Sequence, residues 1–269
     1  MRRFLQSLAL LAALAGFSAS ARATACTHTV NGCVQYALLT RFGPGTATAT
    51  LSSVVAGHTI FVVVNAQTGG GVDTYTLASS CGFTYTKRIS SEHLQYDTFV
   101  DLWDGFATSS CSETVTFGTT GSNIACPCYV IEHSAPSGSS AYDGSNGTYY
   151  GSAGSGVYSS GNVTTTAAGD LCISLANANI TADSFTAQSP YTASVPQSPD
   201  SYWQLDFEDG IVGAAGTNNA TWSVGGASPF LLDIACYKVG GASPPARHAI
   251  IDSRAAPPPS EMLEARGGQ

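Results

Sequence analysis

The feature of this chain that most constrains its fold is a two-residue alternation of apolar and polar side chains. It recurs in short runs between about residues 47 and 239. This period is typical of β-strands, because successive side chains of a strand point to opposite faces of a sheet. Segments rich in Gly, Ser, Asn and Pro separate the runs, and helical periodicity is almost absent. The pattern therefore predicts an all-β fold.

We expect each of these runs to form a strand. They are 47–53, 58–66, 83–90, 96–106, 113–118, 124–133, 161–166, 170–177, 202–208, 219–224 and 230–239. Many short strands at this spacing, with no helices to cover a parallel sheet, favour a single antiparallel β-sandwich of the jelly-roll type.

The N-terminal residues have the features of an export signal. Arg2 and Arg3 precede an apolar run that ends at Phe17, and Ala21-Arg22-Ala23 fits the small-x-small pattern of signal peptidase. We expect cleavage after Ala23. This export signal predicts a secreted or cell-surface protein, and its short form is typical of bacteria.

The chain divides into three parts on this interpretation. Residues 1–23 are the signal peptide, residues 24–239 form the β-sandwich domain, and residues 240–269 form a disordered tail rich in proline. No apolar run after the signal reaches the roughly 18 residues that a membrane-spanning helix needs, so we expect no membrane insertion.

The charge balance excludes one class of partner. Only 10% of the 269 residues are charged, and Asp and Glu outnumber Lys and Arg by 18 to 10. Removal of residues 1–23 takes away three arginines, which leaves 7 basic residues against 18 acids and a net charge of about −11. Nucleic acids and anionic membranes are bound by clustered Lys and Arg, and the sequence contains no such cluster.

Eight cysteines, all after the signal segment, favour disulfides in an exported protein. Cys26 and Cys33 enclose a short loop containing Asn31-Gly32, a turn-forming dipeptide, so we expect them to pair. Cys81 and Cys111 flank the expected hairpin of 83–90 with 96–106. Antiparallel pairing brings the open ends of that hairpin together, which predicts a second disulfide.

Cys126 and Cys128 point to the same face of one expected strand, because they are two residues apart. A direct bond between them is disfavoured for the same reason. We therefore expect them to pair with Cys172 and Cys236, in an order that the sequence leaves open. A zinc site made of these four thiolates is the alternative, although the C-x2-C spacing of zinc ribbons is missing.

The order of motifs resembles a known family. The motifs "VQYALLTRFGPGTATATLSSVVAGHTIFVVV", "FVDLWDGFA", "CYVIEHSAP", "GNVTTTAAGDLCISLANA" and "SPFLLDIACYKV" are similar to an uncharacterised β-sandwich domain, jelly-roll or immunoglobulin-like, of bacterial secreted and surface proteins. The similarity spans most of residues 33–239. It implies a fold and an extracellular setting, and it supplies no catalytic residues.

Two groups of aromatic and acidic residues are candidates for a sugar-binding site. Alternation places Phe99, Asp101 and Trp103 on one face of the expected strand 96–106, and aromatic rings beside carboxylates are a common way to hold sugars. Tyr202 with Asp206 is the second candidate. The alternative is that these aromatic rings belong to the core, because large aromatic side chains are usually buried.

Motifs for catalysis and for cofactors are missing. The sequence contains no H-E-x-x-H, G-x-S-x-G or G-x-x-x-x-G-K motif, and we expect no catalytic residue, no resident metal and no organic cofactor. The carboxylates of Asp206, Glu208 and Asp209 are a candidate calcium site, since calcium prefers clustered oxygen ligands. A solvated strand end is the alternative for these three residues.

Three functions fit these observations. The favoured one is a secreted, non-catalytic binding or cell-surface protein that contacts glycan, matrix or a protein surface. The second is a structural subunit of an extracellular filament or surface layer, assembled by pairing of strand edges. The third is a carbohydrate-active hydrolase or lyase that uses a pair of Asp or Glu residues.

Overall fold

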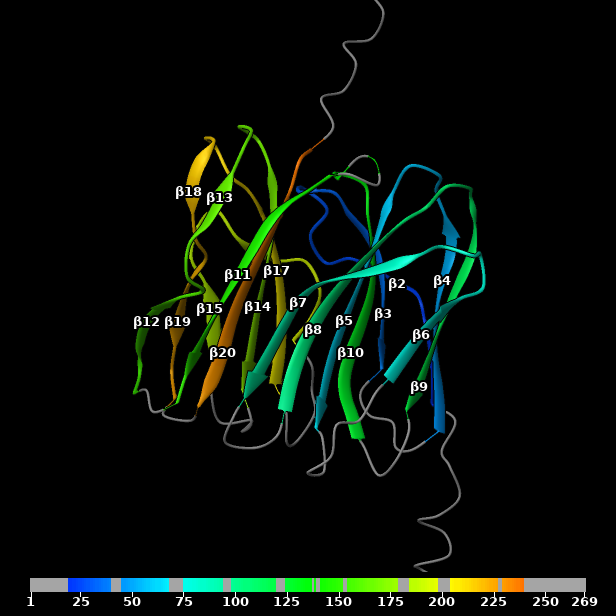
Figure 1. Cartoon of the computed structure of the whole chain (residues 1–269), viewed down its shortest axis with the longest axis horizontal. Helices are drawn as coiled ribbons and strands as arrows, with labels where there is room; N and C mark the ends of the chain where they lie inside the picture. The colour runs from blue at the N-terminus through cyan, green and yellow to red at the C-terminus, as the bar shows by residue number, and fades with distance from the viewer. Residues whose placement is uncertain are drawn as a thin grey trace, which may run out of the picture.

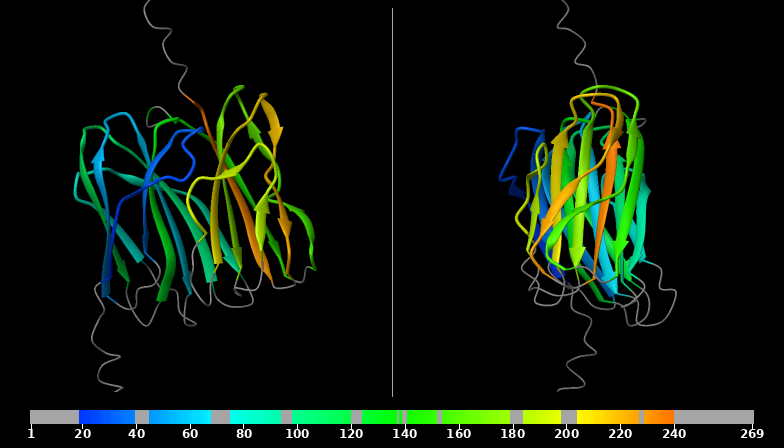
Figure 2. Two further views of the ribbon diagram at one scale, coloured as in Figure 1. Left: turned by 180° about the vertical axis from the view of Figure 1, so that it is seen from behind. Right: turned by 90° about the vertical axis from the view of Figure 1, so that its left-hand side faces the viewer.

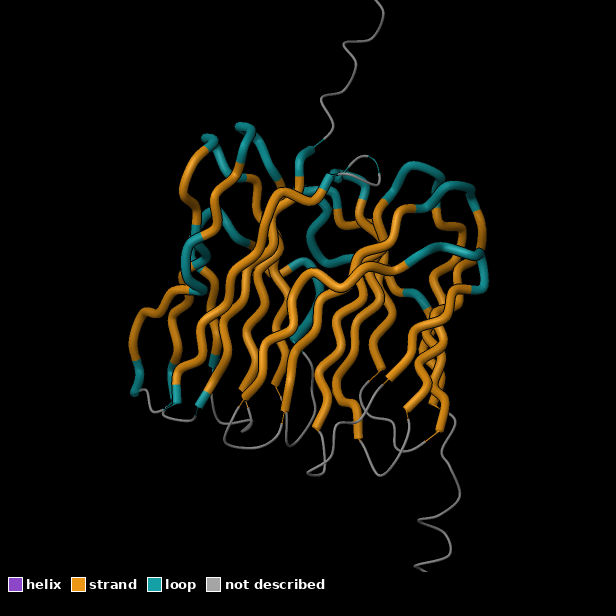
Figure 3. The backbone as a smooth tube through the Cα atoms, viewed as in Figure 1, coloured by secondary structure: helices purple, strands orange, loops and turns teal. Residues whose placement is uncertain are grey.

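The computed structural model shows an all-β protein (Figures 1 and 3). It describes residues 19–39, 45–67, 75–93, 98–119, 124–136, 138, 141–151, 154–178, 184–197, 204–226 and 229–239. In these residues the regular elements are strands, and none of them forms a helix long and apolar enough to cross a bilayer. The prediction of an all-β, disulfide-bridged fold is confirmed.

The strands form sheets that stack in four layers, seen side by side in Figure 1. The N-terminal outer sheet contains β1 (Ala19–Arg22), β4 (Gly45–Val54), β9 (Cys111–Thr119) and β6 (Tyr75–Ser79), in that order. The N-terminal inner sheet contains β2 (Thr24–Ala25), β3 (Cys33–Leu39), β10 (Ile124–His133), β5 (Thr59–Gln67), β8 (Thr98–Phe106) and β7 (Tyr85–His93).

The C-terminal half repeats this arrangement. Its inner sheet contains β11 (Tyr142–Tyr150), β20 (Phe230–Tyr237), β14 (Leu171–Ala178), β17 (Gln204–Ile211) and β16 (Thr192–Ala193). Two small sheets form the outermost layer: β12 (Gly156–Ser159), β19 (Thr221–Val224) and β15 (Phe185–Ala187) in one, and β13 (Val163–Thr165) with β18 (Gly216–Asn218) in the other. Viewed along the stack, the strands of successive layers run roughly along a common axis (Figure 2).

The central strands of the inner sheets are buried on both faces, which explains their sequences. Every residue of β14 and β20 is buried, so these strands are nearly continuous apolar runs in place of alternating ones. Residues on the two faces of β14 serve different cores: Ile173 packs toward the N-terminal inner sheet, whereas Ala176 packs toward the outermost layer.

Three apolar clusters fill the spaces between the four layers. The central one lies between the two inner sheets, where the Phe61 ring lies 5.0 Å from that of Tyr237 and 6.5 Å from that of Phe207. A second cluster joins the N-terminal sheets and includes Leu51 and Phe117. The third surrounds the fully buried Trp222.

Two of the expected disulfides are confirmed. Cys26 is bonded to Cys33, and Cys81 is bonded to Cys111 beside the paired strands β7 and β8. The predicted pairing of Cys126 and Cys128 with Cys172 and Cys236 is wrong, and so is the four-thiolate zinc site, because Cys172 is bonded to Cys236.

The four-layer stack explains this error. Cys172 and Cys236 lie directly opposite each other in β14 and β20, with Cα atoms 4.1 Å apart, and both face the C-terminal outer core. Cys128 is buried in β10 and faces the N-terminal outer core, so two inner sheets separate it from that pair. The side chain of Cys126 lies outside the described residues.

Some structural elements differ from the sequence expectation. Residues 19–22, predicted as part of the signal peptide, form β1, which pairs with β4 in the only parallel ladder of the described strands. Strand β11 has the sequence YDGSNGTYY, which resembles a loop, yet it pairs along its length with β20. Residues 240–269 lie outside the described part of the chain.

The central core yields a stability prediction. Phe61→Ala removes a fully buried ring between the inner sheets and leaves a cavity, so we expect a loss of about 3–5 kcal/mol in the free energy of unfolding. Urea unfolding followed by fluorescence measures it. The control is Val157→Ala in β12, whose side chain is 66% exposed and should change the value by about 0.5 kcal/mol or less. Equal effects of the two substitutions would contradict the described packing.

Candidate functional site

A cavity of about 460 Å³ opens where the β7–β8 edge of the N-terminal half meets β11 and β20 of the C-terminal half. We call it the seam cavity. Its wall combines threonine hydroxyls, glycine backbone and aromatic rings around one pair of charged side chains. The lining residues are Thr59, Gly82, Phe83, Thr84, Thr86, Arg88, Asp104, Gly105, Phe106, Thr108, Gly138, Ala141, Tyr142 and Tyr237.

The charged pair consists of Arg88 and Asp104. The Arg88 Nε lies 2.7 Å from the Asp104 Oδ2, and the guanidinium carbon lies 4.4 Å from the centre of the Tyr142 ring. Both side chains are mostly buried, with about a fifth of Arg88 exposed. A planar guanidinium stacked on a ring and bonded to a carboxylate has a fixed orientation. The pair therefore presents a donor and an acceptor in a defined arrangement.

A β-bulge in β7 brings Arg88 to this wall. Lys87 lies opposite Trp103 of β8, and Ile89 lies opposite the next residue, Leu102, so Arg88 is the extra residue of the bulge. Because of this shift, Arg88 contacts Tyr142 of the C-terminal half while Ile89 still packs in the central core.

Two tyrosines from the C-terminal half complete the wall. The buried Tyr237 hydroxyl lies beside Asp104, and the rings of Tyr142 and Tyr237 make an edge-to-face contact with centres 5.7 Å apart. Burial raises the pKa of Asp104, although its bond with the Arg88 guanidinium opposes the shift. The cavity wall thus provides ring faces, hydroxyls and a neutralised charge pair.

The first sugar-site candidate from the sequence lies on the opposite face of β8. Phe99, Asp101 and Trp103 do share that face, and Tyr75 of β6 joins them. The Tyr75 and Phe99 rings are stacked with centres 5.5 Å apart, and the Trp103 Nε1 donates to the Tyr75 hydroxyl at 2.9 Å.

Asp101 is enclosed by this cluster. Its carboxylate accepts a hydrogen bond from the Tyr75 hydroxyl and lies 2.5 Å from the Lys87 Nζ. The Lys87 ammonium lies 5.0 Å from the Trp103 ring centre, so it covers the indole as well. Burial, together with the neighbouring Asp101 charge, raises the pKa of Tyr75, which keeps the phenol protonated as a donor. Asp101 is fully buried and already paired, and the three rings are half-buried.

The second sugar-site candidate is described only in part. Tyr202 lies outside the described residues. Asp206 is buried in β17, and its Oδ2 accepts from the Gln204 and Gln197 amides at 3.1 and 3.2 Å. Burial raises the pKa of Asp206 to about 8. Asp206 is absent from the wall of the seam cavity.

The proposed calcium ligands do not converge. Asp206 and Glu208 lie on one face of β17, whereas Asp209 lies on the other, where its Oδ1 accepts from Asn31 at 2.7 Å and its Oδ2 is 3.4 Å from His133. A site that uses all three carboxylates is therefore not formed, because adjacent residues of a strand point apart.

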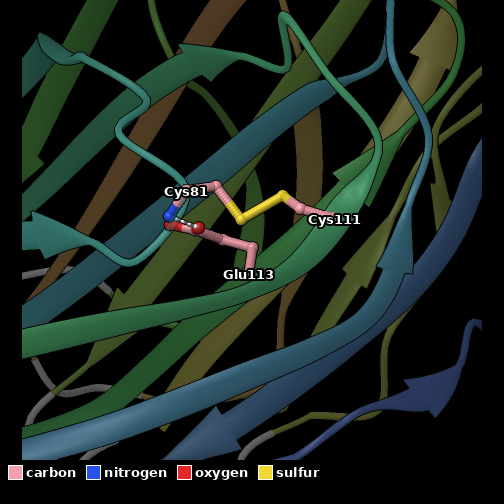
Figure 4. Close-up of side chains that lie close together, drawn as sticks. All are labelled: Cys81, Cys111 and Glu113. Carbon is pink, nitrogen blue, oxygen red and sulfur yellow. Dashed lines mark hydrogen bonds between the residues drawn. A yellow bond between two sulfur atoms is a disulfide. The ribbon is translucent and has the colours of Figure 1, made fainter.

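One metal-like grouping occurs in the described part of the chain, and Figure 4 shows it. Ligand atoms of Cys81, Cys111 and Glu113 lie within 4.8 Å of one another, but the two sulfurs are bonded to each other. The buried Glu113 carboxylate accepts from the Cys81 N–H at 2.9 Å and from the Tyr85 hydroxyl at 2.9 Å. The group is a structural link between β9 and the turn that precedes β7.

Arg88, Tyr142 and Tyr237 were not among the residues predicted from the sequence. One signal was available: Lys87 and Arg88 are the only Lys or Arg residues between positions 42 and 237. Basic residues that are so rare in a chain, and adjacent, suggest specific partners. The two tyrosines carry no local signal, because only the contact between the two halves brings them to Arg88.

Comparison with models of protein families finds no match, and comparisons with curated proteins and with solved structures find none either. The resemblance to a bacterial β-sandwich family therefore stays a prediction.

The buried acids yield a pH prediction. Burial raises the pKa of Asp206 and of Glu208 to about 8 and that of Asp233 to about 7, against roughly 4 in an unfolded chain. The folded protein therefore binds these protons more tightly than the unfolded chain. The resulting stability is complete below about pH 4 and is lost as the pH rises through about 7 to 8. We expect the free energy of unfolding to fall steadily between pH 5 and pH 8, because each of these carboxyls lowers it by about 1.4 kcal/mol per pH unit until the pH passes its folded-state pKa.

Urea unfolding across this pH range measures the loss, and Asp206→Asn provides the control. Asp206 lies on the same face of β17 as Glu208, and the charges of Asp206 and Asp209 raise the pKa of Glu208 further. Tyr129 of β10 is also close to Asp206. The asparagine variant lacks one titrating carboxyl, so its stability should fall less steeply with pH. An unfolding midpoint that rises from pH 5 to pH 8 would contradict the assignment.

Proposed function

We propose that this chain is an exported, non-catalytic protein that binds a glycan in the seam cavity. The observation that carries the proposal is the Arg88–Asp104 pair, stacked on Tyr142 in the wall of a cavity of about 460 Å³. Three disulfides and a composition poor in charged residues support the extracellular setting.

The chemistry of the wall fits a neutral, hydroxylated ligand. The Arg88 charge is balanced by Asp104, and these are the charged members of the lining set. A carboxylate accepts from sugar hydroxyls, a guanidinium donates to them, and ring faces pack against the apolar faces of sugar rings. Pockets of this size with a few converging polar groups are typical ligand sites and often lie at the contact between two packed units.

The same wall argues against glycoside hydrolysis. Hydrolases of this kind use two carboxyl groups about 5–10 Å apart on either side of the scissile bond. Among the described lining residues, Asp104 supplies the one carboxylate, and it is bonded to Arg88. Binding is therefore the function that this geometry supports best.

The experiment is a glycan-array screen of the purified exported chain, followed by calorimetric titration of each hit. We expect Arg88→Lys to weaken binding at least tenfold, or about 1.4 kcal/mol, because lysine keeps the charge but loses the planar stacking on Tyr142 and the Nε bond to Asp104. A reducing-sugar assay on the same hits should show no release.

The matched control is Lys87→Arg. It makes the reverse exchange of basic side chains at the adjacent position of β7, and it keeps a positive charge at Asp101 on the other face of the sheet. We expect it to bind as the unchanged protein does. If Arg88→Lys leaves glycan binding unchanged, the binding site lies outside the seam cavity. An array without hits would contradict the proposal as a whole.

A further inference from the structure

Residues 19–25 connect the two N-terminal sheets at their open edge. Strand β1 runs parallel to β4, with Ala19 opposite Ala47 and Arg22 opposite Thr50. The chain then crosses over, and β2 pairs with β3 of the inner sheet, with Thr24 opposite Tyr36. One short segment therefore contributes ladder hydrogen bonds to both sheets of the N-terminal sandwich.

The side chains of this segment alternate as those of a docked strand do. Ser20 and Arg22 are exposed, whereas Ala21 and Ala23 are half-buried and pack against the apolar cluster between the N-terminal sheets. The half-buried positions of the segment therefore lie on the core-facing side of the outer sheet that β1 joins. Residues 19–22 thus belong to the folded domain by pairing and by packing.

Cleavage after Ala23, which the Ala21-Arg22-Ala23 pattern suggests, would separate β1 from β2. It would remove β1 and leave the edge of β4 unpaired along residues 47–50. An unpaired edge is a template for association with other chains. The sequence also contains an earlier site of the same type, since Gly16-Phe17-Ser18 is a small-x-small triplet directly before β1.

We propose that signal peptidase cleaves this chain after Ser18, so that the mature protein begins at Ala19 and retains β1 as the edge strand of the N-terminal outer sheet. This inference rests on the export that is part of the proposed function. It places the cleavage five residues before the position expected from the Ala21-Arg22-Ala23 pattern, and it assigns residues 19–22 a structural role.

The test is expression of the full chain in a secreting bacterial host, followed by N-terminal sequencing and intact mass of the exported protein. A start at Ala19 supports the proposal. A start at Ser20 or any later residue, Thr24 above all, overturns it while leaving export intact. An uncut chain that stays in the cytosol overturns export itself, so the two failures are distinguishable.

A second measurement tests the docking of β1 in the exported chain. Ala21→Asp places a charge against the apolar cluster and should lower the thermal midpoint by roughly 2–8 °C. Ser20→Asp makes the same charge change at the exposed neighbouring position and should leave the midpoint unchanged. Equal midpoints for the two variants would overturn the structural role of β1.

Discussion

Packing between the two inner sheets is the constraint on which the rest of this structure depends. Their central strands have no solvent face, so apolar side chains must fill both sides, and the neighbouring valines Val62 and Val63 of β5 serve two different cores. Any acid on such a strand needs a partner, because a buried charge without one is costly. The fully buried Glu132 meets this need by accepting from Gln35 at 2.6 Å, from the Val55 N–H at 2.9 Å and from His58 at 2.7 Å.

Hydrogen bonds between the two inner sheets add geometric specificity to this apolar packing. Ser91 of β7 donates to Asp233 of β20 at 2.6 Å, and the Tyr129 hydroxyl of β10 donates to the Leu205 carbonyl at 3.1 Å. Apolar surfaces alone tolerate sliding, whereas each of these bonds forms in one relative position of the two sheets. Gly147 in β11 makes the first of them possible, because a Cβ there would collide with the Asp233 carboxylate.

The sequence predicted the fold class and most of the strands because alternation and turn chemistry are local properties. It failed where the outcome depends on neighbours in space. The glycine-rich sequence of β11 resembles a loop. Glycine is needed at position 147 because of its neighbour in space, Asp233, with which a Cβ would collide. Cys172 shares a sheet with Cys236, which no spacing along the chain reveals. For the candidate sites, alternation correctly grouped Phe99, Asp101 and Trp103 on one face, but their burial was decided by Tyr75 and Lys87, which come from other strands.

The seam cavity follows from the same constraint. A regular β7 would use one residue opposite Leu102 to fill the central core, and that residue would have to be apolar. The bulge supplies two: Ile89 fills the core, and Arg88 becomes available to the wall. Asp104, opposite Thr86 on the same side of the sheet, then balances the charge that the bulge introduces. The contact between the two inner sheets is therefore apolar over most of its area. At the edge where β7 departs from regular pairing, it contains the seam cavity, whose wall is polar and balanced in charge.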